Sequence, residues 1–177
     1  METKYFIIPG LGNSGPNHWQ THLENLGNHY IRIEQNEWDK PNCEDWINNI
    51  EAAVSKYNLD NIILIGHSLG CTTIAHWAKK FKHKIKGALL VAPSDIEAQV
   101  YTFEATGFVP IPLDKLNFKT IVVTSENDVW VSLERAKYFA EKWGSELINI
   151  GNAEHINADS GFGEWKECLE ILKKIEK

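Results

Sequence analysis

The chain has 177 residues, of which 43% are hydrophobic and 24% charged, and its formal net charge is −6. This length and composition are typical of a soluble globular protein with a substantial core, and we expect residues 1–177 to form one domain. The negative charge argues against a surface that binds nucleic acid or anionic membranes.

The cysteines and the N-terminus indicate the compartment. Cys43, Cys71 and Cys168 are an odd number without CxxC spacing, which indicates reduced thiols and not a disulfide framework. The start, "METKYFIIPG", has no basic segment followed by a long apolar stretch, and no run is long enough to span a bilayer. We therefore expect a cytoplasmic protein without a membrane or nucleic-acid partner; whether it has protein partners is left open by the sequence.

Apolar runs typical of buried strands alternate with segments of helical periodicity. Strands are expected at residues 4–8, 30–33, 61–65, 85–91, 119–124 and 146–150. Helices are expected at residues 17–26, 43–57, 68–81, 132–143 and 163–175. Strands without strict alternation, separated by helices, predict an α/β fold with a mostly parallel sheet of about six strands covered on both faces. Residues 95–117 fit neither pattern and are expected to form a short lid or pocket wall instead of a large cap.

The first expected strand ends in a glycine-rich loop, "PGLGNSGP". The spacing of Gly10, Gly12 and Gly15 matches GxGxxG, which binds dinucleotides when an acidic residue also closes the second strand. Only Glu34 could be that residue, so a dinucleotide-binding enzyme is the weaker interpretation and no cofactor is expected.

A pair of histidines, His18 and His22, follows this loop with a spacing of four residues. Trp19 stands where a HExxH zinc motif requires glutamate, so no metal site is expected. We expect both histidines to lie on a helix surface.

The segment "NIILIGHSLGC" places a Gly-x-Ser-x-Gly motif where the third strand passes into a helix. This is the context of a nucleophile elbow, in which Gly66 and Gly70 remove side chains that would clash in a tight turn. The Ser68 hydroxyl would then lie above the carboxyl edge of the sheet, at the positive end of the next helix. The alternative is that Ser68 only caps that helix; the strand before it and the helix after it favour the nucleophile. His67 is expected to pack beside it.

A serine hydroxyl needs a base, and in this type of fold the acid and the histidine follow the serine in that order, each after a later strand. Asp128 follows the fifth expected strand in "SEND", and His155 follows the sixth in "GNAEH". We expect His155 to accept the Ser68 proton and Asp128 to orient the imidazole. The alternatives are a helix-capping role for Asp128, a surface position for His155, and Asp95 or Glu126 as the acid.

Backbone amides and aromatic side chains would complete the site. The oxyanion hole is expected from the N–H of Leu69, after the nucleophile, and that of Leu11, with Gly12 as the near alternative. Trp19, Trp130 and Trp165 lie in or next to predicted edge loops and could form an apolar acyl pocket. The tryptophans at helical spacing, Trp46, Trp77 and Trp143, are expected in the core. The expected pocket residues are Gly12, His67, Phe108, Trp130 and Trp165.

Several long segments, among them "PGLGNSGPNHWQTHLE", "IEQNEWDKPNCEDW", "LIGHSLGCTTIAHW" and "HINADSGFGEW", resemble the small serine-hydrolase branch of the α/β-hydrolases typified by retinoblastoma-binding protein 9. The resemblance runs nearly end to end. It implies a compact α/β-hydrolase fold without a large cap, with Ser68, Asp128 and His155 as the catalytic triad. The sequence departs from the family at Glu154, where glycine is frequent, and at "VWVS" after the acid, where a Tyr-Val-Pro-like run is frequent.

These features predict a carboxylesterase-like serine hydrolase that cleaves a small-molecule ester, or an amide, through an acyl-enzyme, without a cofactor or metal. The alternative is a non-catalytic interaction protein that retains the hydrolase fold for its surface. The presence of Ser68, Asp128 and His155 together favours the enzyme.

Overall fold

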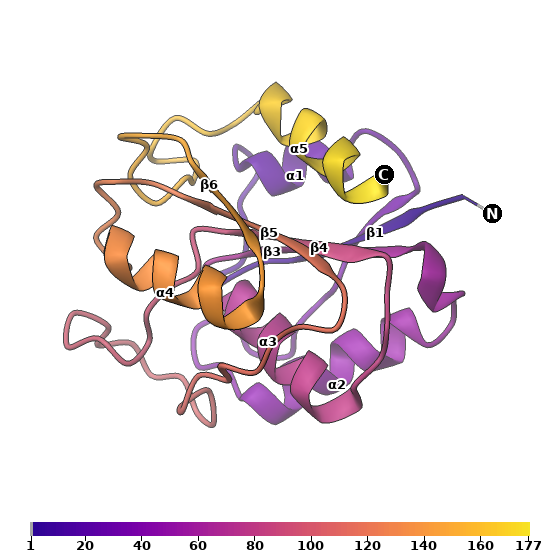
Figure 1. Ribbon diagram of the computed structural model, residues 1–177, viewed down its shortest axis with the longest axis horizontal. Coiled ribbons are helices and arrows are strands. Elements are labelled where there is room, and N and C mark those ends of the chain that lie inside the picture. Colours follow the sequence, from indigo (N-terminus) through magenta and orange to yellow (C-terminus); the bar gives the residue numbers. More distant parts are fainter. Residues whose placement is uncertain (1) are drawn as a thin grey trace.

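The computed structural model describes residues 2–177 and contains one sheet of six strands in the order β2-β1-β3-β4-β5-β6 (Figure 1). All neighbouring strands are parallel. The strands are β1 (Lys4–Ile8), β2 (Tyr30–Arg32), β3 (Ile62–His67), β4 (Gly87–Val91), β5 (Lys119–Thr124) and β6 (Glu146–Asn149). The predicted fold class is confirmed, since the sheet is parallel and is covered on both faces.

The helices form a layer on each face of the sheet (Figure 1). They are α1 (Trp19–Glu24), α2 (Cys43–Val54), α3 (Leu69–Phe81), α4 (Leu133–Trp143) and α5 (Lys166–Glu176), and a short 3₁₀ helix spans Leu59–Asn61. One hydrophobic core lies under α2, α3 and α4 and contains Trp46, Trp77 and Trp143, as predicted. The other lies under α1 and α5. Alternate side chains of each central strand enter opposite cores, and this accounts for strands that are apolar throughout.

The ends of several elements differ from those that the periodicity predicts. Helix α1 begins only at Trp19, since the His18 side chain accepts a hydrogen bond from the Gln20 N–H as an N-cap. Helix α2 ends at Val54, although the apolar pattern continues to Tyr57. Strand β3 begins after the 3₁₀ helix and continues through His67, so it leads directly into the serine turn.

The long connection between β4 and β5 is irregular and is attached to the helical layer. Thr106 forms backbone hydrogen bonds with Pro41 and Cys43, each 2.9 Å long. The carbonyl of Phe108 lies 2.9 Å from Nε2 of His76 on α3. The connection therefore rests on α2 and α3 and is not a separate cap. None of the helices within residues 2–177 is long and apolar enough to cross a lipid bilayer.

Candidate active site

Ser68 occupies a strained turn between β3 and α3. Its backbone has φ 54° and ψ −123°, a region that a residue with a side chain rarely occupies and that costs about 1–3 kcal/mol. A Cβ on Gly70 would lie 2.1 Å from the Ile8 carbonyl oxygen, and one on Gly66 would lie 3.0 Å from the Cys71 nitrogen. A side chain at Gly70 would clash with the backbone and one at Gly66 would crowd it, so the strained elbow expected from the motif is present.

The structure brings Ser68, His155 and Asp128 together from three different loops. The Ser68 hydroxyl lies 2.9 Å from Nε2 of His155, and Nδ1 of the same ring lies 2.8 Å from Oδ2 of Asp128. The Asp128 side chain is fully buried. Because a carboxylate only accepts hydrogen bonds, the proton of the neutral imidazole is on Nδ1, and Nε2 is free to accept the serine proton.

Hydrogen bonds hold the loop that carries Asp128 against the loop that carries His155. The Trp130 N–H donates to Oδ1 of Asp128 at 2.9 Å. The Ala153 N–H donates to the Ser125 hydroxyl at 2.9 Å, and the Glu154 N–H donates to the Asn127 side chain at 2.8 Å. Thus the polar residues of "SEND" around Asp128 fix the histidine loop, a role that was not predicted from the sequence.

Glu154 occupies a backbone conformation that explains the glycine frequent at this position in the resembling family. Its φ is 48°, in the left-handed region where a side chain is disfavoured. The departure from the family is therefore accommodated with some strain immediately before His155.

The two rival acids point to other partners. The Asp95 carboxylate forms an ion pair with Arg135 at 3.1 Å. Glu126 accepts a hydrogen bond from the Asn149 side chain at 2.9 Å. Since only Asp128 contacts the His155 ring, the geometry favours it as the acid.

The loop after β1 passes directly beside the serine. A Cβ on Gly10 would lie 2.8 Å from Cβ of Ser68, so this approach requires glycine. The Gly12 N–H donates to the Trp38 carbonyl at 2.9 Å and is therefore engaged elsewhere. Within residues 2–177 the amides of Leu11 and Leu69 have no such acceptor, and Leu69 is the first residue of α3. Of the two candidates in the loop, Leu11 is the better second oxyanion donor.

Ser94, which follows β4, was missed in the sequence. Its hydroxyl lies 2.6 Å from the Ser68 hydroxyl, and the residue is 1% exposed. Because the Ser68 proton is directed to Nε2 of His155, Ser94 must be the donor in this contact. Its place in "VAPSD" at the carboxyl edge of the sheet is the only signal that could have identified it.

Two further histidines lie behind the His155 ring. His67 is buried, and its Nε2 lies 2.9 Å from the His155 carbonyl oxygen. Burial lowers the pKa of the His67 imidazole well below its usual range, and His155 and His18 add to this effect. His18 is 5% exposed, which corrects the expectation that it lies on the helix surface; His22 is exposed, as expected. The burial of His18, together with the charges of Arg32 and His155, lowers the pKa of the His18 imidazole to about 3.

Two cavities open on either side of Ser68, and both are bordered by Leu11, His155 and Asn157. The first, of about 320 Å³, is lined by both polar and apolar surface, with His18 and Asp159 among its polar side chains; we call it the polar cavity. The second, of about 190 Å³, we call the aromatic cavity. Its remaining lining residues are Ser94, Tyr101, Phe103 and Trp130.

Of the expected pocket residues, the structure places Trp130 and His67 beside Ser68 but not the others. Phe108 is fully buried in the core against the Trp46 ring, because the connection after β4 turns inward there. Trp165 lines a different cavity, where its ring packs against Trp19. Gly12 borders neither cavity beside Ser68 and only shapes the loop. These three pocket assignments are corrected.

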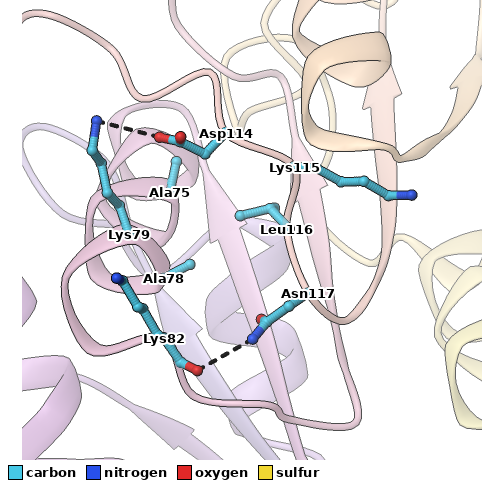
Figure 2. Close-up of a pocket in the computed structure, with 8 residues that line it drawn as sticks. All are labelled: Ala75, Ala78, Lys79, Lys82, Asp114, Lys115, Leu116 and Asn117. Atoms are coloured by element: carbon cyan, nitrogen blue, oxygen red, sulfur yellow. Dashed lines mark hydrogen bonds and ion pairs between the residues drawn. The ribbon is translucent and has the colours of Figure 1, made fainter.

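A larger cavity of about 490 Å³ lies at the end of α3, away from the serine (Figure 2). Its sides are the last turns of α3 and residues 114–117, joined by an ion pair between Lys79 and Asp114 at 3.3 Å. The Asn117 side chain also donates to the Lys82 carbonyl. Ser68, Asp128 and His155 are not among the residues that line this cavity, so its larger size does not make it the candidate site.

Comparisons with known proteins bear on the family and the fold of this chain. The family model for serine hydrolases matches residues 5–174. The structure is similar to a protein of Pectobacterium atrosepticum described as a YdeN-like hydrolase, with 34% identity, a TM-score of 0.88, and coverage of 99% of this chain and 91% of that chain. It is also similar to the ydeN gene product of B. subtilis, at 19% identity and a TM-score of 0.75, with 98% of both chains covered.

A more distant structure, Est1E of Butyrivibrio proteoclasticus with ferulic acid bound, shares the fold at 16% identity and a TM-score of 0.69. Coverage is 98% of this chain and 86% of that chain. A search of curated proteins gave no significant match.

Proposed function

The chain belongs to the serine hydrolase family, and from this premise we propose that it hydrolyses small carboxylic esters through an acyl-enzyme formed on Ser68. The observation that carries the proposal is the continuous hydrogen-bonded series from Ser68 through His155 to the buried Asp128. The narrower assignments, to the branch typified by retinoblastoma-binding protein 9 and to the cytoplasm, stay predictions from the sequence.

Ser68, His155 and Asp128 each act in both halves of the proposed reaction. Nε2 of His155 accepts the Ser68 proton as Oγ attacks the ester carbonyl, and the oxyanion lies against the Leu11 and Leu69 amides. The ester bond then breaks, and the Nε2 proton goes to the leaving oxygen, which departs as an alcohol. Water loses a proton to Nε2 and attacks the acyl-enzyme. The carboxylic acid leaves as Ser68 regains its proton, and Asp128 stabilises the imidazolium in both halves.

The aromatic cavity is the proposed acyl site. Phe103 and Trp130 pack with their ring centroids 5.3 Å apart beside Ser68, and Tyr101 lies at the same wall. Its volume of about 190 Å³ is below the range of about 300–1,000 Å³ usual for sites of drug-sized ligands. The acyl group that fits is therefore small.

The first test is a series of p-nitrophenyl esters of increasing acyl length. Each methylene gains about 0.8 kcal/mol only while the cavity offers apolar surface to cover it. We expect kcat/KM to rise over the shortest chains and to flatten or fall by about eight carbons, where that gain ends. Activity that keeps rising through long-chain esters would contradict a small acyl site.

A pair of tryptophan variants sharpens this test. Trp130→Ala removes a wall of the aromatic cavity and should move the preferred acyl length upward. Trp165→Ala is the control, since this tryptophan lines a different cavity and should leave the length profile in place. If the preferred acyl length changes in Trp165→Ala and not in Trp130→Ala, the acyl group binds in the cavity lined by Trp165 and not in the aromatic cavity.

Ser94→Ala should lower kcat with little change in KM. The Ser94 hydroxyl donates to Oγ of Ser68, and this bond strengthens as the oxygen becomes negative during attack and during acyl-enzyme breakdown. Hydrogen bonds to charged groups contribute about 1.5–3 kcal/mol, so kcat should fall about tenfold to a hundredfold. Steady-state kinetics with one short-chain ester measure this.

The matched control is Ser145→Ala. Its hydroxyl forms an equally short contact of 2.6 Å with Thr120, far from the sheet edge that carries Ser68. An equal loss in both variants would show that removing any such hydroxyl perturbs the fold, and an unchanged kcat in Ser94→Ala would give Ser94 a packing role only.

A further inference from the structure

Ser68 borders two cavities that differ in the side chains lining only one of them. On one side lie the rings of Tyr101, Phe103 and Trp130. The other cavity is lined by His18 and Asp159, together with the glycine-rich loop, and Asn157 borders both cavities. An ester bound across Ser68 must place its acyl group in one cavity and its leaving group in the other.

The order of the reaction assigns the polar cavity to the leaving group. The leaving alcohol departs first, and the water that cleaves the acyl-enzyme must reach the position it vacated, beside Nε2 of His155. His18 and Asp159 offer that water hydrogen-bond partners in the polar cavity, whereas the three rings of the aromatic cavity cover the apolar acyl group. This assignment rests on the proposed esterase function.

His18 supplies a fixed hydrogen-bond donor in the polar cavity. Its Nδ1 accepts the Gln20 N–H at 3.2 Å as the N-cap of α1, so the ring proton of the neutral imidazole is on Nε2. The ring packs edge-on against His67, with centroids 4.7 Å apart, and this contact fixes its orientation. Because the low pKa of about 3 keeps the ring neutral, it donates one hydrogen bond without adding a positive charge.

Two other polar side chains of this cavity, Asn157 and Asp159, complement hydroxyl groups, and the charge of Asp159 opposes anions. Oδ1 of Asn157 accepts from the Ser160 N–H at 3.0 Å, which leaves its NH₂ group as a donor for a ligand. The exposed carboxylate of Asp159 is an acceptor with a negative charge. No lysine or arginine is among the residues that line the polar cavity within residues 2–177. Donors and an acceptor together suit an alcohol group, which both accepts and donates.

We propose that the polar cavity is a leaving-group site for uncharged polyhydroxy alcohols, in which the Nε2–H of His18 donates to a hydroxyl oxygen of the leaving group. The protein therefore selects esters of hydroxyl-rich alcohols over esters of plain alkyl alcohols and over esters of hydroxy acids.

The test uses three esters with the same acyl group: propyl butyrate, glyceryl monobutyrate and the butyrate ester of glycerate. Two or three net hydrogen bonds should give glyceryl monobutyrate a kcat/KM at least about fivefold above that of propyl butyrate. Of the two hydroxylated esters, the glycerate ester should be the poorer substrate. Equal kcat/KM values for the propyl and glyceryl esters would overturn the proposal while leaving the esterase function intact. No hydrolysis of any of the three would overturn both.

Matched variants test which side chains produce the preference for the glyceryl ester. His18→Asn keeps a side-chain oxygen that can cap α1 but lacks Nε2, so it should lower kcat/KM for the glyceryl ester about fivefold to tenfold more than for the propyl ester. A merely structural role would lower both equally, and that result would overturn the role of His18. His22→Asn makes the same change on the exposed side of α1 and should alter neither value. Asp159→Asn should improve the glycerate ester alone; if it does not, the charge argument is wrong.

Discussion

Ser68→Ala is expected to lose about six orders of magnitude in kcat for ester hydrolysis, because the nucleophile, base and acid act as a unit. The variant should fold normally. Its missing hydroxyl faces His155 and Ser94 and not a core, and alanine experiences the same backbone strain at φ 54° as serine. Initial rates on p-nitrophenyl butyrate and the melting temperature of each protein measure the two effects.

Ser145→Ala again serves as the control and should keep the wild-type rate. A Ser68→Ala protein that hydrolyses the ester at the wild-type rate would remove the nucleophile assignment. A variant that fails to fold would contradict the view that the strained turn is held by its neighbours, Gly66 and Gly70, and not by the hydroxyl.

The second large effect is expected at the acid. Asp128→Asn keeps the shape of the side chain, but its amide can donate to Nδ1 of His155 and so favours the tautomer with the proton on Nε2, which cannot accept the Ser68 proton. The expected loss is about 10⁴ in kcat. Asp128 is fully buried and contacts Nδ1 through both oxygens, at 2.8 and 3.0 Å, so solvent cannot substitute for it.

Asp95→Asn tests the rival acid in the same assay. Asp95 pairs with Arg135, and its replacement should cost little activity. A reversed outcome, with a large loss for Asp95→Asn and a small one for Asp128→Asn, would mean that the acid follows β4 and that the order of residues along the chain was misapplied.

The parts of this protein that the sequence predicts are those fixed by local pattern. Strand and helix periodicity predicted the parallel sheet, and in such a sheet the ends of neighbouring strands meet at one edge. That rule is sufficient to place Ser68, Asp128 and His155 at the same edge of the sheet. It does not bring His155 to Ser68, because β4 and β5 lie between β3 and β6, and the loop after β6 has to reach across them. The motif around Ser68 needs only the clash that Gly66 and Gly70 avoid, which is also local.

The cavity walls could not be predicted in the same way, because they depend on how an irregular segment folds back. Phe108 and Phe103 lie in the same connection and are equally apolar, yet one is fully buried against Trp46 and the other borders the aromatic cavity. His18 has the pattern of a surface residue, but capping of α1 turns its ring inward. Ser94 carries no motif, and its role depends on a contact with a residue far away in the sequence.

The most direct measurement is the labelling of the protein by a fluorophosphonate probe, followed by mass spectrometry of its peptides. Such a probe phosphonylates only a serine whose hydroxyl is activated by a base. The account predicts one adduct, on Ser68, in the wild-type protein and none in Ser68→Ala. A folded wild-type protein that takes up no label would contradict it and would favour a non-catalytic protein that retains the hydrolase fold. An adduct that persists in Ser68→Ala would place the nucleophile elsewhere.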